Sequence, residues 1–215
     1  MKISFLCSDP KHPVNSYLYK WIEKNSTKHT IELARKKDEL SGGDILFLVS
    51  CSEIINKKDR SSYNKSLVLH ASDLPEGRGW SPHIWQIIEG SDEITITLLE
   101  AEDKVDSGDI WKKIKFEIPN HALWDEINHR LFEKEIELID FAVQNFDSII
   151  PTPQNLNIKP KYYPKRTPLD SKLDICRSIT SQFDKIRVCD PNRFPAYLEI
   201  HGKKFKLTLE RIDNE

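Results

Sequence analysis

Two short apolar runs are the feature that most limits how this chain can fold. Asp44–Ser50 (DILFLVS) and Lys65–His70 (KSLVLH) have the length of strands and consist largely of aliphatic residues. Such runs are typical of strands that are buried on both faces, as in a parallel sheet covered by helices. They therefore predict a parallel sheet at the centre of the molecule.

Strand patterns and helix patterns alternate through the first 150 residues. Further strands are expected at Lys2–Cys7, His29–Ala34, Glu93–Glu100 and Ile110–Phe116, and helices at 15–24, 82–89 and 121–146. Ser81 is expected to cap the second helix, with Pro82 in its first turn and Gly90 at its end. This alternation predicts an α/β fold with a Rossmann-like, doubly wound, mostly parallel sheet flanked by helices.

The chain is expected to have three parts: a main domain at 1–150, a Pro-rich linker at 151–170, and a small C-terminal unit at 171–215. Five of the 12 prolines lie from residue 151 to residue 168, which indicates an extended segment. The C-terminal unit is predicted to hold a short helix at Ile175–Arg187 and a hairpin over residues 196–212. The edge of this hairpin offers a surface for a homodimer.

Composition excludes several classes of protein. The 32 basic and 34 acidic residues give a net charge of −2, which does not favour nucleic acid as a partner. No apolar stretch approaches the ~18 residues of a membrane span, and the short N-terminal run is better explained as a strand than as a signal peptide. The four cysteines form no C-x-x-C pair, so reduced thiols, a cytoplasmic location and no metal site are expected.

Ligands of open α/β sheets bind beyond the carboxyl ends of the strands. Three segments are predicted to lie there: Ser50–Glu53, the stretch that begins at His70, and the turn that contains Asp106. A histidine base needs an acceptor on its second ring nitrogen, and Asp106 could supply it from a neighbouring strand end. Plainer alternatives are a structural histidine at the strand end and an aspartate that caps its own turn.

Two motifs in this region resemble those of a known family. His70-x-Ser72-x-Leu74-Pro75 with Arg78-Gly79, and later Asp106-x-Gly108-Asp109, are similar to the folate-dependent formyltransferases, which include methionyl-tRNA, glycinamide ribonucleotide and sugar N-formyltransferases. The resemblance implies 10-formyltetrahydrofolate as co-substrate and an Asn–His–Asp triad. In that triad His70 assists proton transfer at the attacking amine, and Asp106 orients His70 and helps the proton reach the folate nitrogen.

The third member of the triad is missing. The resemblance places an asparagine two residues before the histidine, where this chain has Val68. Valine cannot donate a hydrogen bond to a developing oxyanion, and losing such a donor lowers the rate by about 10²–10³-fold. Candidate substitutes are a backbone N–H near Ser81 and the side chains of Ser50, Ser52, Ser72 and His83, although His83 also fits an ordinary, partly exposed helix residue.

The resemblance also implies two sets of binding residues. The folate is expected to contact backbone groups of two segments, formed by Ser50, Cys51, Ser52, Glu53, Leu99, Glu100, Ala101, Glu102 and Asp103. The acceptor is expected to contact cationic and aromatic residues that could bind a diphosphate and a base, namely Arg78, Trp80, Lys161, Tyr162, Tyr163, Lys165 and Arg166, together with Gly79. Alternatively, the charges of the linker are solvated and its tyrosines pack against the protein.

The acceptor is predicted from the C-terminal part of the chain. Lys165-Arg166-Thr167-Pro168 and the segments after it resemble the sugar N-formyltransferases. This implies a nucleotide-activated amino sugar, such as a 4-amino-4,6-dideoxy sugar of a bacterial surface glycan. Two alternatives stay open: formyl transfer to another small amine, and a catalytically weak protein that binds folate or a nucleotide sugar.

Overall fold

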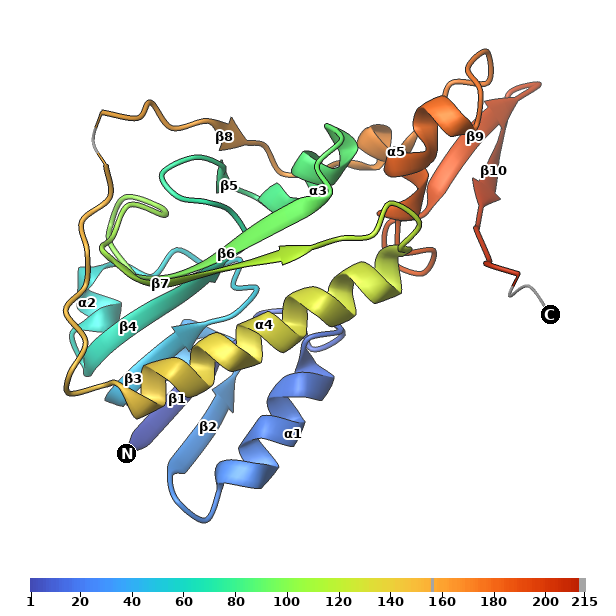
Figure 1. Cartoon of the computed structure of the whole chain (residues 1–215). Helices are drawn as coiled ribbons and strands as arrows, with labels where there is room; N and C mark the ends of the chain where they lie inside the picture. The colour runs from blue at the N-terminus through green and yellow to red at the C-terminus, as the bar shows by residue number, and fades with distance from the viewer. Residues whose placement is uncertain (156, 213–215) are drawn as a thin grey trace.

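One sheet organises the chain in the computed structural model, which describes residues 1–155 and 157–212 (Figure 1). The strand order is β2-β1-β3-β4-β6-β7. The strands are β1 (Lys2–Leu6), β2 (Thr30–Ala34), β3 (Gly43–Leu48), β4 (Tyr63–His70), β6 (Glu93–Glu100) and β7 (Ile110–Glu117). The first four are parallel, and β6 and β7 are antiparallel. The predicted fold, a Rossmann-like and mostly parallel sheet flanked by helices, is confirmed.

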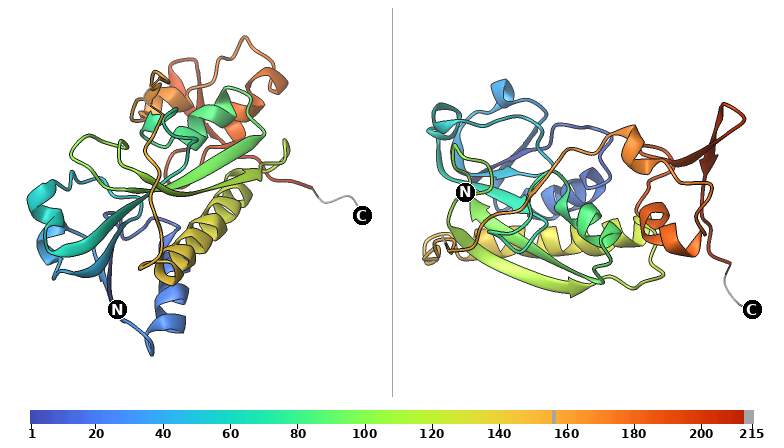
Figure 2. Two further views of the ribbon diagram at one scale, coloured as in Figure 1. Left: turned by 60° about the vertical axis from the view of Figure 1, so that its left-hand side comes forward. Right: turned by 90° about the horizontal axis from the view of Figure 1, so that it is seen from above.

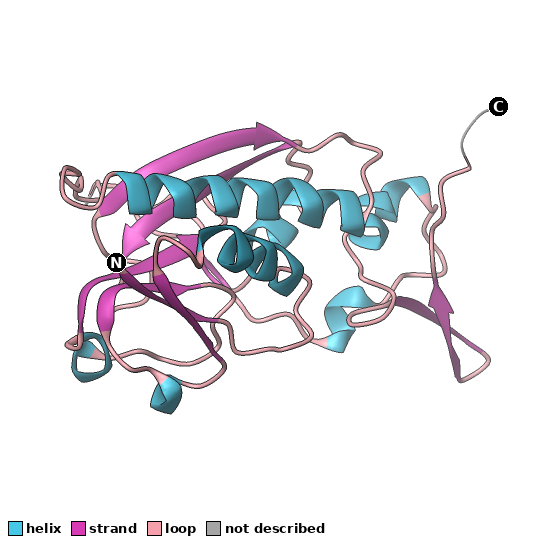
Figure 3. Cartoon of the chain, turned by 90° about the horizontal axis from the view of Figure 1, so that it is seen from below, coloured by secondary structure: helices cyan, strands magenta, loops and turns pink. Residues whose placement is uncertain are grey.

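Helices α1 and α4 cover one face of this sheet (Figure 3). The helices are α1 (Asn15–Asn25), α2 (Lys57–Arg60), α3 (Pro82–Ile88), α4 (Trp124–Gln144) and α5 (Phe183–Arg187), with 3-10 turns η1 (Lys37–Glu39), η2 (Pro168–Ser171) and η3 (Thr180–Gln182). Successive side chains of a strand point to opposite faces, so every second residue enters this core. It includes Phe5, Phe47, Leu67, Leu69 and Leu98 from the strands, and Leu18, Trp21, Leu131 and Leu138 from the helices.

The opposite face of the sheet holds a smaller apolar cluster and the residues of interest. Leu6, Leu46 and Leu48 form its centre. Val68 packs against this cluster, and His70 lies two residues further along β4, so both side chains point to this face. The sheet therefore separates the main core from the face on which the predicted site is built.

Helix α3 starts differently from the prediction. Pro82 is in its first turn and Gly90 follows its last turn, as expected, but Ser81 does not cap it. A capping residue needs an extended backbone so that its side chain reaches the free N–H groups. Ser81 instead has φ 44° and makes no capping hydrogen bond.

The C-terminal part packs at one end of the sheet (Figure 2). Its hairpin of β9 (Ala196–Ile200) and β10 (Lys203–Leu207) was predicted, but the helix expected at Ile175–Arg187 is confined to α5. Ile175 and Ile179 are exposed, so that segment has no apolar stripe to bury. None of the helices in the described part of the chain is long and apolar enough to cross a bilayer.

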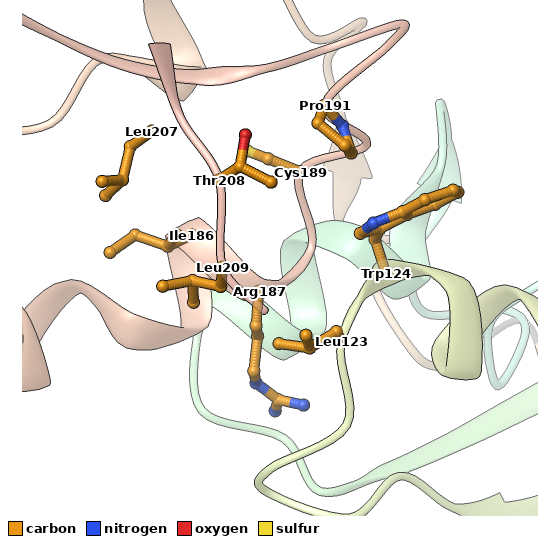
Figure 4. A pocket seen from close by; sticks show the side chains of 9 residues that line it. All are labelled: Leu123, Trp124, Ile186, Arg187, Cys189, Pro191, Leu207, Thr208 and Leu209. Carbon is orange, nitrogen blue, oxygen red and sulfur yellow. The ribbon is translucent and has the colours of Figure 1, made fainter. Parts of the chain in front are cut away.

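A small crevice lies between this C-terminal part and the start of α4 (Figure 4). Its volume of about 10 Å³ is close to that of a single water site. The residues that line it are Leu123, Trp124, Ile186, Arg187, Cys189, Pro191, Leu207, Thr208 and Leu209. None of them belongs to the predicted site, so this crevice is a packing feature of the C-terminal part.

We predict that Glu135 of α4 makes stability depend on pH. Its side chain is buried without a partner for Oε2 among the described residues, and burial raises its pKa from 4.5 to about 8. The folded state therefore holds a proton that the unfolded chain releases, and stability falls as pH rises between these two values. Glu135→Gln should raise the free energy of unfolding at pH ~9 by about 2–4 kcal/mol and change it less at pH ~5.

Urea unfolding at several pH values measures this effect. Glu137→Gln, on the same helix but half exposed, is the matched control and should retain the pH dependence of the wild type. Parallel stability curves for wild type and Glu135→Gln would contradict the prediction.

Candidate active site

His70 and Asp106 meet on the face of the sheet opposite α1 and α4. His70 Nδ1 lies 3.5 Å from Asp106 Oδ1, and the two side chains are only 8% and 7% exposed. His70 Nε2 lies 2.8 Å from the carbonyl oxygen of Gly77, to which it can only donate. Both ring nitrogens thus face oxygen atoms, and the ring orientation is fixed from two sides.

Asp106 reaches His70 by a different route from the one predicted. It was expected at the carboxyl end of a strand beside β4, but β6 is antiparallel to β4, and His70 pairs with Thr97 in the middle of β6. The loop of residues 101–109, here called the Asp106 loop, turns back from the end of β6 toward His70. Asp106 does not cap its own turn: its Oδ2 accepts a hydrogen bond from the Gly79 N–H at 2.9 Å.

The Pro-rich linker lies directly against the site. Its strand β8 (Tyr162–Tyr163) pairs in parallel with β5 (Arg78–Gly79) (Figure 1). The N–H groups of Arg78 and Trp80 donate to the carbonyl oxygens of Lys161 and Tyr163, each at 3.0 Å. The segment that provides Gly79 to Asp106 is therefore held between the Asp106 loop and the linker.

Two predicted acceptor-binding residues are used to fix the linker instead. Tyr163 is buried, its ring stacks on Trp85 with an interplanar angle of 3°, and its hydroxyl donates to Glu89. Lys161 pairs with the same carboxylate of Glu89 at 2.7 Å. The alternative in which the tyrosines pack against the protein describes Tyr163, whereas the Lys161 side chain is 55% exposed although it pairs with Glu89.

Arg78 is also not presented as a diphosphate ligand. It is 5% exposed, and its Nη2 donates to Gln154 Oε1 at 2.6 Å. A guanidinium this deeply buried has little surface to offer a phosphate, although its Nε has no partner among the described residues. The structure therefore corrects the predicted role of Arg78.

Other members of the predicted acceptor set remain accessible. Trp80 and Tyr162 are 42% and 53% exposed. Lys165 is exposed, and its Nζ lies 4.7 Å from the centroid of the Trp80 ring. Arg166 is half-buried and donates to Ser171 Oγ at 2.9 Å. An exposed indole, phenol and ammonium group thus lie on the polypeptide segments next to Gly79.

The position of the missing asparagine is apolar. The strand register places Val68 between Leu48 and Leu99, so three aliphatic residues lie side by side. Val68 is half-buried, and an amide at this position would find no polar partner in that row. The valine therefore agrees with its neighbours.

Two of the proposed substitute donors have solvent-shielded polar atoms without a partner among the described residues, His83 Nδ1 and Ser72 Oγ. Burial, and next the charges of His12, His70 and Arg166, lower the pKa of His83 from 6.5 to about 3. The ring is therefore neutral near pH 7 and carries one N–H. Ser72 is fully buried and lies next to Gly77, whereas Ser50 and Ser52 are exposed.

His12 belongs to the same neighbourhood and was missed from the sequence. It follows β1, packs edge-on against Phe132, and contributes to the lowered pKa of His83. Burial, and next the charge of Arg193, lower the pKa of His12 itself to about 4. In the sequence, only its position shortly after the first strand could have indicated that His12 lies near the site.

One residue from each of the two segments predicted to bind folate packs on this face of the sheet. Cys51 and Ala101 both pack against the apolar cluster that includes Val68. The acidic side chains of these segments are engaged elsewhere: Glu53 accepts from Lys37 N, Glu100 pairs with Lys65, and Glu102 and Asp103 pair with Arg60. Aliphatic side chains and backbone groups are left to contact a ligand, which suits a flat heterocycle with a polar edge.

The residues of the candidate site do not form a metal centre. Across residues 1–155 and 157–212, no three His, Cys, Asp or Glu side chains gather in a way that could hold a metal ion.

The chain belongs to the formyl transferase family, whose model matches residues 6–143. It is 30% identical over 181 residues to the methionyl-tRNA formyltransferase of Rickettsia typhi, an alignment that covers 83% of this chain and 57% of that protein. The chain thus spans little more than half the length of this relative.

Solved structures share the fold across nearly the whole chain. A methionyl-tRNA formyltransferase from Clostridium thermocellum superposes with a TM-score of 0.84 at 20% identity, covering 99% of this chain and 94% of that one. A 4-N formyltransferase from Francisella tularensis gives 0.73 at 17%, covering 99% and 98%. HypX from Aquifex aeolicus, in complex with tetrahydrofolic acid, gives 0.79 at 25%, covering 95% of this chain and 36% of HypX. The first two likenesses show a shared fold only.

We predict that Gly79 cannot be replaced without loosening the linker. Its φ is +99°, and a Cβ there would lie 2.4 Å from the carbonyl oxygen of Tyr163. Gly90 has a similar φ of +96° but open space around it, so Gly90→Ala reports the backbone strain alone. Gly79→Ala should lower the free energy of unfolding by about 1–3 kcal/mol more than Gly90→Ala, as measured by urea denaturation. Equal losses would show that the contact with Tyr163 is unimportant.

Proposed function

We propose that this protein transfers a formyl group from 10-formyltetrahydrofolate to the amine of a nucleotide-linked amino sugar. The observation that supports this most strongly is the buried contact between His70 and Asp106 in a member of the formyl transferase family. A histidine oriented by a carboxylate is suited to moving a proton at a reacting amine.

The folate is proposed to bind on this face of the sheet, where Cys51 follows β3 and Ala101, which lies beside Ser66 of β4, follows β6; both pack against the apolar cluster that Val68 also contacts. When bound, it supplies a formyl carbon whose bond to the folate nitrogen is replaced by a bond to the acceptor amine, while one proton passes from that amine to the folate nitrogen. The tetrahydrofolic acid complex of the HypX relative supports this co-substrate.

His70 and Asp106 are proposed to assist the transfer of this proton from the amine to the folate nitrogen. The carboxylate of Asp106 is held by the Gly79 N–H and favours positive charge on the His70 ring as the amine loses its proton. His70 Nε2 donates to the carbonyl of Gly77 before substrate binds, so the ring has to break this bond and carry its proton on Nδ1, toward Asp106, before Nε2 can accept a proton from the amine. Hydrogen bonds of this kind often rearrange when the substrate complex forms.

His83 is proposed to replace the missing asparagine. Its neutral ring carries one N–H and has an unpartnered, solvent-shielded nitrogen near His70. A preorganised neutral donor can stabilise negative charge that develops on the formyl oxygen. Ser72 Oγ, which is also unpartnered, is the second candidate for this role.

The acceptor is proposed to lie along the linker. Trp80 and Tyr162 offer exposed rings for a nucleotide base, and Lys165 offers a cation for a diphosphate. The structure of a sugar N-formyltransferase from Shewanella sp., which matches this chain with a TM-score of 0.75 and covers 100% of it and 99% of that protein, supports a sugar acceptor. The methionyl-tRNA formyltransferase relatives favour a second candidate, an aminoacylated tRNA.

We expect formyl transfer to be detectable by mass spectrometry of the acceptor. The protein is incubated with 10-formyltetrahydrofolate and a panel of dTDP-, UDP- and GDP-linked amino sugars, with methionyl-tRNA as a separate arm. The proposal predicts that one amino sugar gains the mass of one carbonyl unit. Formylation of methionyl-tRNA alone would replace the sugar proposal, and tight nucleotide-sugar binding without a mass change would indicate a binding protein.

Substitutions test the assigned residues once an acceptor is known. His70→Ala should lower kcat by about 10²–10⁴-fold because the proton acceptor is lost. His83→Ala should lower kcat by about 10²-fold or more, and Ser72→Ala by less, if His83 is the oxyanion donor. His121→Ala is the control, because His121 is exposed and lies outside this region. Unchanged kcat in His70→Ala would refute the assignment of the base.

A further inference from the structure

Gln154 is a buried polar residue of the linker to which the proposed mechanism gives no role. It is 7% exposed and stands directly after Pro153. Its Nε2 donates to the carbonyl oxygens of Asp106 and Gly108, both at 2.9 Å. Its Oε1 accepts from Arg78 Nη2 at 2.6 Å. Both donor hydrogens of the amide and its carbonyl oxygen are therefore used.

These contacts join the two segments that hold the Asp106 carboxylate. Asp106 and Gly108 belong to the Asp106 loop, and Arg78 precedes Gly79, whose N–H donates to Asp106 Oδ2. Gln154 thus fixes the backbone of the loop on one side and the start of the β5 segment on the other. The bond from the Arg78 guanidinium is charge-assisted, so it is stronger than a bond between two neutral groups.

The Asp106 loop requires such external support. Asp106 itself has φ 53°, a left-handed conformation that is unfavourable for a residue with a side chain. Gly108 approaches the end of β6 so closely that a Cβ there would lie 1.9 Å from the carbonyl oxygen of Glu100. A strained turn of this kind persists only where its surroundings over-determine it, and Gln154 supplies two of those contacts.

We propose that Gln154 is a positioning residue that holds the Asp106 carboxylate against His70 and Gly79. It touches neither reacting group and acts through the backbone of the Asp106 loop. Its effect on turnover rests on the proposed function, but its effect on the position of Asp106 does not. Arg78 is the partner that orients the amide of Gln154.

Amide hydrogen exchange of the Gly79 N–H tests the position of Asp106 without any substrate. This N–H is bonded to the Asp106 carboxylate, whereas the neighbouring Trp80 N–H is bonded to Tyr163 of the linker. In Gln154→Glu, the side chain can still accept from Arg78 but, when ionised, cannot donate to the loop carbonyls. The Gly79 amide should then exchange ~10-fold or more faster, while the Trp80 amide stays within about twofold.

Two further variants keep the test decisive. Gln154→Ala removes all three bonds and should also accelerate Gly79. Asn155→Ala alters the exposed neighbouring residue in the same segment and should leave both amides unchanged. Equal rates for Gly79 in wild type and Gln154→Glu would overturn the proposal. Equal acceleration of Gly79 and Trp80 would also overturn it, because it would show that the whole linker detaches.

Kinetics with the accepted amine add a second readout. In Gln154→Glu, kcat should fall by about 10–100-fold with KM within about twofold, because displaced catalytic groups affect the chemical step more than binding. The pH dependence of kcat in Gln154→Glu should shift toward that of Asp106→Asn, the variant that lacks the carboxylate. A rise in KM alone would contradict a positioning role. If the wild type turns over no acceptor, the proposed function fails while the exchange experiment still decides the role of Gln154.

Discussion

The buried carboxylate of Asp106 is the group on which the geometry of this site depends. A charge that is 93% removed from solvent would be very unfavourable without partners, so the protein must bring donors to it. It receives the N–H of Gly79 on one oxygen and faces the ring of His70 with the other. These partners come from separate segments, so satisfying one charge fixes the end of β4, the β5 segment and the Asp106 loop relative to one another.

The linker completes this arrangement. Strand β8 pairs with β5, the stacked rings of Tyr163 and Trp85 and the Lys161–Glu89 ion pair fix it to α3, and Gln154 fixes the Asp106 loop. A segment with this many proline residues has lost little conformational freedom on becoming ordered, because proline already restricts the unfolded chain. The region between the main domain and the C-terminal part is thus a structural element of the site rather than a spacer.

The parts of this structure that could be predicted from the sequence are those encoded by local patterns. The continuous apolar runs of β3 and β4 located the central strands, and the His70 and Asp106 motifs located the pair that meets in space. The apolar runs indicated a parallel sheet for β3 and β4 but did not give the direction of β6, which is antiparallel to β4. The predicted route by which Asp106 reaches His70 was therefore wrong. The partners of Arg78 were also unpredictable, because a buried guanidinium and a phosphate-binding one have the same sequence signature. Gln154 gave only the weak signal of a polar residue between prolines.

The aliphatic row of Leu48, Val68 and Leu99 affects the strength of electrostatic interactions near His70. Leu48, Val68 and Leu99 lower the local polarity on one side of the site, and electrostatic interactions are stronger where water is excluded. In such surroundings a second ionised group near His70 would be costly, and the low pKa of His83 keeps that ring neutral. A neutral N–H donor stabilises developing negative charge without competing with His70 for the Asp106 carboxylate. The valine at residue 68 and the half-buried, neutral histidine at residue 83 are therefore compatible parts of one electrostatic arrangement.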